Sequence, residues 1–140
     1  FNYMRPDDIN IEAAISSNQN YIKVYYQKKL SQLTTTKKEI SQKRMQGHIK
    51  EKNIKAETLN SIINNSKYKN QRIDFLNIDI EGADLEALKS LDFRIYDPKI
   101  ICIEIIEKNI INSEIYKFLN DLNYRKIWSS KSCFNHIFVK

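Results

Sequence analysis

The chain has 140 residues, of which 41% are hydrophobic and 29% are charged, a balance typical of one globular domain and not of a disordered segment. No apolar run approaches the roughly 20 residues of a membrane-spanning helix, and no signal-peptide pattern occurs at the start. The net charge of +6 suits an anionic partner, although heavy use of Lys, Asn and Ile explains it equally well.

The first part of the chain is predicted to form two strands. Residues 5–8 are typical of a turn, and residues 9–15 have the pattern of a short strand. A polar turn then leads to residues 21–26, which are rich in aromatic and β-branched side chains. We expect the two strands to form a hairpin or a pair at the edge of a sheet.

Residues 28–55 are strongly basic, with nine Lys or Arg against two Glu, so this segment carries +7 in a chain whose total is +6. The run Thr36-Lys37-Lys38-Glu39 fits the capping box that begins a helix, and Gly47 suits its end. Ile40 and Met45 give this helix little apolar surface. The segment is either a mobile lid over a substrate or a solvated insertion, and its charge favours the insertion. A short edge strand is predicted at 54–57.

Residues 73–88 contain a strand that changes into a helix. Apolar and polar residues alternate up to Ile80, whereas leucines recur at helical spacing after Gly82. The change places Asp79 and Glu81 at the carboxyl end of the strand, where ligands bind in open α/β sheets. A strand end that merely faces water would also explain two carboxylates.

A second strand, residues 100–106, is apolar on both faces, as expected of a buried parallel strand, yet it carries Glu104 near its end. An unpaired buried carboxylate is costly, so Glu104 is expected to have a partner or to face a polar cleft. The intervening helix makes a strand-helix-strand unit. A further helix is predicted from residue 112 to about Leu122, followed by strands at 124–128 and 135–140. His136, in the last strand, is interpreted as structural.

Residues 74–88 and 98–104 resemble the signature of the FkbM family of S-adenosylmethionine-dependent methyltransferases. That family has an Asp-Leu-Leu-Lys-Ile-Asp-Val-Glu-Gly-like strand and turn, followed by a strand that ends in Glu. Asn77 stands where the family often has Lys, and Asn60 replaces the Asp of a Thr-Leu-Asp-x-Leu-Leu run. Asn123 replaces the Gly of a Leu-Gly-Tyr helix end, and Asn also tolerates the left-handed conformation needed there.

The resemblance implies an α/β fold: an incomplete Rossmann-like class I methyltransferase sheet with an antiparallel terminal strand pair. It covers most of residues 58–140 and, more loosely, residues 5–26. We therefore expect a single, partial domain over residues 1–140, with a basic helical insertion at about 28–55. The glycine-rich turn and the acid-ended strand that bind the cofactor in such folds are not found, and the resemblance places both before Phe1.

The resemblance also implies S-adenosylmethionine as cofactor and a hydroxyl of a sugar or other small molecule, glycans included, as methyl acceptor. Asp79, Glu81 and Glu104 are the catalytic candidates. Ala14 and Ile15, together with Asp79, are the cofactor-binding candidates, although small residues at a strand end also permit close packing. We predict no metal, even though an Asp/Glu cluster suits hard cations.

Two other functions stay open. A non-catalytic fragment that packs against a partner would explain the missing cofactor motifs. A nucleic-acid-binding module would explain the basic segment, but its Lys residues are not interleaved with aromatic residues as a stacking surface requires. The cysteines, Cys102 and Cys133, lack metal-ligand spacing, and we expect reduced thiols in a cytoplasmic protein.

Overall fold

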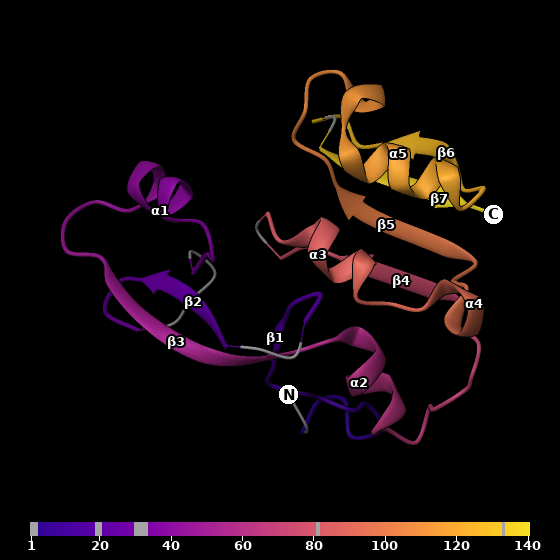
Figure 1. Cartoon of the computed structure of the whole chain (residues 1–140), viewed down its shortest axis with the longest axis horizontal. Helices are drawn as coiled ribbons and strands as arrows, with labels where there is room; N and C mark the ends of the chain where they lie inside the picture. Colours follow the sequence, from indigo (N-terminus) through magenta and orange to yellow (C-terminus); the bar gives the residue numbers. More distant parts are fainter. Residues whose placement is uncertain (1–2, 19–20, 30–33, 81, 133) are drawn as a thin grey trace.

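The computed structural model describes residues 3–18, 21–29, 34–80, 82–132 and 134–140. Over these ranges the chain is an α/β protein with two sheets of mixed strand direction (Figure 1). The strand order is β1-β3-β2 in the first sheet and β4-β5-β7-β6 in the second. None of the helices in the described part of the chain is long and apolar enough to span a membrane.

The first sheet is built around β3 (Lys50–Glu57), with β1 (Ala14–Ile15) parallel on one side and β2 (Tyr21–Tyr26) antiparallel on the other. The predicted hairpin between the first two strands is therefore wrong, because each pairs with β3 instead. The strand predicted at 9–15 is reduced to its last two residues. The predicted edge strand at 54–57 is the end of the central strand.

Helix α1 (Lys38–Arg44) packs against β2. It begins one residue later than the capping box predicts, because Lys37 is the N-cap and makes no side-chain cap hydrogen bond. Ser41 and Met45 are buried, so the helix is anchored more firmly than its apolar content indicated. The basic segment 28–55 thus contains α1 and most of β3 and is not wholly helical.

The second sheet joins β4 (Phe75–Ile78) in parallel to β5 (Ile100–Glu104), and β7 (Asn135–Val139) lies antiparallel between β5 and β6 (Arg125–Ser129). The expected antiparallel pair of terminal strands is confirmed as β6 and β7.

Helices α3 (Asp84–Lys89) and α5 (Glu114–Asp121) bury their apolar residues against one face of this second sheet. The shared core consists of Ile78, Ala87, Leu88, Ile101, Ile103, Ile105, Leu119, Tyr124 and Phe138. Each fully buried large side chain contributes about 1.5–3 kcal/mol to folding. Residues that alternate with the core residues point to the opposite face, where Phe75, Ile100 and Trp128 are between 37% and 56% exposed.

Short helices connect the strands and fix the approach to β4 and β5. Helix α2 (Leu59–Asn64) is capped by Thr58, and α4 (Phe93–Tyr96) begins after Asp92; η1 (Ile110–Asn112) is a 3-10 turn before α5. The Oδ1 of Asn60 accepts a hydrogen bond from the backbone N–H of Asp92 at 2.8 Å, so the uncharged Asn still ties the two helices together. Asn123 has φ +66°, which confirms the left-handed residue expected after α5.

Candidate functional site

The turn between β4 and α3 is held by a buried carboxylate. Asp84 is 3% exposed and accepts hydrogen bonds from the backbone N–H groups of Ile80 at 3.2 Å and Gly82 at 3.0 Å. Gly82 has φ +92°, which side-chain-bearing residues rarely adopt. The sequence analysis overlooked Asp84, although an acid two residues after a strand-ending glycine suggests such a side-chain-to-backbone turn.

Two of the predicted catalytic residues are brought to neighbouring positions. Ile78 pairs with Ile103 in the parallel register, so Asp79 and Glu104 are the next residues on the two adjacent strands. Since Ile78 and Ile103 point into the core, Asp79 and Glu104 fall on the opposite face of the sheet. The pKa of the Cys102 thiol, on that same face, is raised by burial and by the negative charge of Asp79.

The other predicted site residues are Glu81, in the turn sequence, and Ala14 and Ile15, near the start of the chain. Glu81 lies outside the described residues. Ala14 and Ile15 form β1 and are half-buried, and Ile15 packs against the core of the second sheet. Just after β1, the Ser17 hydroxyl donates a hydrogen bond to the Glu86 carboxylate on α3. The end of β1 therefore lies beside α3.

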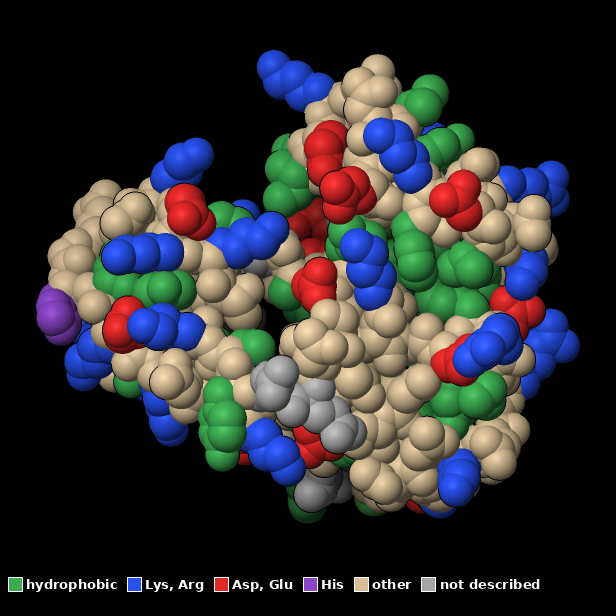
Figure 2. Space-filling model, in the orientation of Figure 1, with side chains coloured by type: hydrophobic (Ala, Val, Ile, Leu, Met, Phe, Trp, Pro, Cys, Tyr) green, Lys and Arg blue, Asp and Glu red, His purple; other side chains and the backbone are tan. Residues whose placement is uncertain are grey.

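A cavity of about 390 Å³ opens next to the Gly82 turn, within the size range of small-molecule sites. Its lining comes from the turn, from the start of α3, from the end of β5 and the loop that follows, from α5, and from the residue that caps α1: Gly82, Asp84, Leu85, Glu104, Ile106, Glu107, Glu114, Ile115 and Lys37. Figure 2 shows acidic side chains along one wall of a notch near the middle of the molecule. Of the described candidates from the sequence, Glu104 is the one that lines this cavity.

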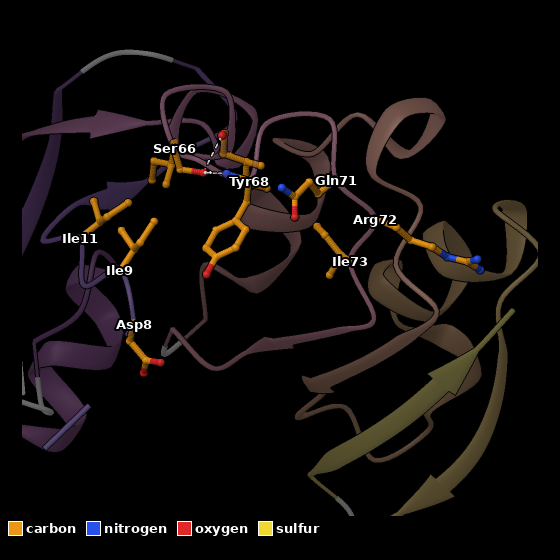
Figure 3. A pocket seen from close by; sticks show the side chains of 10 residues that line it. Asp8, Ile9, Ile11, Ser66, Tyr68, Gln71, Arg72 and Ile73 are labelled. Atoms are coloured by element: carbon orange, nitrogen blue, oxygen red, sulfur yellow. Dashed lines mark hydrogen bonds between the residues drawn. The ribbon is translucent and has the colours of Figure 1, made fainter. Parts of the chain in front are cut away.

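A second cavity, of about 410 Å³, lies at the other end of β4 (Figure 3). In Figure 3, Ile9 and Ile11 lie across from the ring of Tyr68, and Asp8 lies at the rim. Ile73, which also lines it, precedes β4, whereas Asp79 follows that strand. This cavity is therefore at the amino end of the strand, away from Asp79 and Glu104.

Within the described ranges, no group of three or more His, Cys, Asp or Glu side chains is arranged to hold a metal ion. The chemistry available at the Gly82 turn is that of carboxylates and one ammonium. Carboxylates accept protons and hydrogen bonds, and an ammonium donates them.

Comparison with known proteins identifies the family. The family model described as the methyltransferase FkbM domain matches residues 1–126 of the 140-residue chain. No curated protein and no solved structure matches the chain. Because the matched region spans nearly the whole sequence and includes β4, the Gly82 turn and β5, the chain belongs to the FkbM methyltransferase family.

Proposed function

We propose that this protein is an S-adenosylmethionine-dependent O-methyltransferase that acts on a hydroxyl of a sugar or other small molecule. The observation that carries the proposal is that Asp79 and Glu104 occupy neighbouring positions at the carboxyl ends of two adjacent parallel strands, in a chain of a methyltransferase family. The strand order β4-β5-β7-β6, with β7 antiparallel, supports a Rossmann-like class I sheet.

The residues at the end of β4 fit the cofactor by charge. S-adenosylmethionine carries positive charge on its sulfonium and ammonium groups, and Asp79 is an exposed carboxylate. Ala14 and Ile15 are half-buried, so each exposes a limited area of apolar surface, and such surface can pack against an adenine ring. We therefore assign Asp79, Ala14 and Ile15 to cofactor binding. When bound, the cofactor supplies an electrophilic methyl group.

The carboxylates provide the acid-base part of the reaction. A hydroxyl of the acceptor donates a hydrogen bond to Asp79 or Glu104, and that carboxylate takes its proton. The hydroxyl oxygen would take the methyl group as the bond from methyl carbon to sulfonium sulfur breaks, which would leave the sulfur as a neutral thioether. General base catalysis of this kind contributes about 10²–10⁴-fold. The product is a methyl ether. Asp84 positions the strand end by holding the backbone of the turn, and it does not take part in proton transfer.

The test is methyl transfer by the natural protein at its full length. Radiolabelled S-adenosylmethionine is incubated with a set of methyl hexopyranosides, and ether products are counted. Asp79→Asn is expected to lower turnover by about 10²-fold or more, with the circular dichroism spectrum unchanged, because the residue is exposed. Asp74→Asn is the matched control: Asp74 precedes β4, is exposed, and pairs with Lys99. Wild-type turnover in Asp79→Asn would refute the assignment of Asp79.

A further inference from the structure

The start of α1 reaches the turn that carries the candidate site. A Cβ atom built on Gly82 would lie 3.3 Å from Cδ1 of Ile40 and 3.5 Å from Nζ of Lys37. Helix α1 is anchored on the first sheet by the buried residues Ser41 and Met45, whereas Gly82 follows β4 of the second sheet. The basic segment therefore forms one wall of the site, and Figure 1 shows α1 and α5 on opposite sides of the α3 region.

Ile40 and Lys37 make chemically different contributions at this contact, one apolar and one charged. Ile40 places its methyl group against the backbone of the turn, which fixes where α1 begins relative to β4. Lys37, the N-cap residue, lines the cavity together with Glu104, Glu107 and Glu114. Among the described lining residues it is the only base.

The lining side chains thus include acceptor-only carboxylates and one donor-only ammonium. A carboxylate accepts hydrogen bonds, and an ammonium donates them. A compound with two neighbouring hydroxyls can use both kinds of group, because one oxygen accepts a hydrogen bond from the ammonium while the adjacent hydroxyl donates to a carboxylate. Neighbouring oxygens therefore match the chemistry of this cavity lining.

We propose that Lys37 is a specificity-determining residue for the methyl acceptor. Its ammonium donates a hydrogen bond to an oxygen adjacent to the hydroxyl that is methylated, while Glu104, which lines the same cavity, accepts a hydrogen bond from the acceptor. The acceptor is then a compound with vicinal oxygens. This inference rests on the proposed function, since it concerns the substrate of the same site.

The experiment compares two neighbouring lysines at the start of α1, the N-cap Lys37 and the first helical residue Lys38, in the full-length protein. Lys37→Met removes the ammonium and keeps most of the side-chain length. Lys38→Met is the matched control, because Lys38 is exposed and lies outside the cavity lining. The acceptors are methyl hexopyranosides and the matched deoxy analogues that lack the hydroxyl next to the methylated position. KM for the acceptor, kcat and the dissociation constant of S-adenosylmethionine are measured for each variant.

Loss of a charge-assisted hydrogen bond raises KM for the vicinal acceptor by about 10- to 100-fold in Lys37→Met. The deoxy analogue is expected to show the same KM in wild type and Lys37→Met, because the partner oxygen is missing from it. The dissociation constant of the cofactor stays unchanged, and Lys38→Met resembles wild type. As a readout independent of turnover, saturating acceptor slows acetylation of Lys37 by acetic anhydride, followed by mass spectrometry, and leaves acetylation of Lys38 unchanged.

The outcomes separate the two proposals. If the wild type transfers methyl groups but Lys37→Met and Lys38→Met have the same KM for the vicinal acceptor, the role of Lys37 is refuted and the proposed function stands. If the wild type transfers no methyl group to any acceptor and binds no S-adenosylmethionine, the proposed function is refuted, and the role of Lys37 falls with it.

Discussion

Replacement of Gly82 by Ala tests how the two sheets meet, because the chain contains a matched control. Its two glycines have nearly the same φ angle, +92° at Gly82 and +89° at Gly47. An added Cβ at Gly47 would have no atom within 4 Å, whereas at Gly82 it would meet Ile40 at 3.3 Å and Lys37 at 3.5 Å. Alanine at either position therefore strains the backbone, but only alanine at position 82 also makes a close contact with another side chain.

The expected magnitudes follow from this difference. A non-glycine residue held in such a backbone region costs about 1–3 kcal/mol, so Gly47→Ala and Gly82→Ala both lower the free energy of unfolding by that amount. At Gly82 the end of the Ile40 side chain has to move by a few tenths of an ångström, whereas the distance to Lys37 is an ordinary van der Waals contact. We expect the contact with Ile40 to add less than about 1 kcal/mol, within the cost of a strained rotamer.

The assay is urea denaturation followed by circular dichroism, with the midpoint and slope fitted for each variant. In the Gly82→Ala background, Ile40→Ala is expected to recover the part of the lost stability that comes from the contact with Ile40. The part that comes from the strained backbone at residue 82 is expected to remain. A Gly82→Ala variant as stable as wild type would refute the backbone assignment. Full recovery of stability by Ile40→Ala would show that the cost is steric and not conformational.

Two further predictions concern buried polar groups. Asp84→Ala leaves the backbone N–H groups of Ile80 and Gly82 without their acceptor, and we expect it to lower the free energy of unfolding in urea by about 2–5 kcal/mol. Asp121→Ala, at the exposed end of α5, is the control and is expected to change stability little. Equal effects of the two substitutions would contradict the stabilising role of the Asp84 hydrogen bonds. The pKa of Tyr124 is raised well above its usual value by burial first and then by the charge and hydrogen bond of Asp97, so the folded state keeps the phenol neutral while the unfolded state ionises near pH 10. The stability contributed by Tyr124 is therefore present below about pH 10 and lost as the pH rises above it. In urea unfolding at a series of alkaline pH values, Tyr124→Phe is expected to show a smaller decline in the free energy of unfolding than wild type. The same decline in both proteins would show that Tyr124 does not cause it.

The elements that the sequence predicted well are those whose signals are local. Alternation up to Ile80 and the following glycine gave β4, its turn and α3 to within a few residues, and the chain of apolar residues from Ile100 gave β5. The left-handed conformation of Asn123 was predicted correctly because Gly and Asn are the residues that most often adopt it after a helix.

The elements that it missed depend on pairing between distant segments. Strand β3 is mostly charged, so its propensity does not mark it as the centre of a sheet, and its pairing with the aromatic-rich β2 decides its place. Helix α1 has few apolar residues, yet it packs against β2, Met45 at its end is buried, and Ile40 contacts a turn more than 40 positions away. Asp84 was missed because an acid in the first turn of a helix ordinarily needs no partner beyond the helix dipole. The proximity of Lys37 to Gly82 has no local signal at all.

The charge separation along the chain also gives the folded molecule a polarity. Residues 28–55 carry +7, so the remaining residues sum to −1, and the basic segment folds with α1 and β3 on one side of the molecule (Figure 1). Lys37 and the glutamates of the cavity stand at the boundary between the two regions. The electric field across that boundary has a fixed direction, and at physiological salt it extends about 8 Å beyond the surface. We expect this field to orient a dipolar molecule as it approaches, and added salt to weaken that orientation.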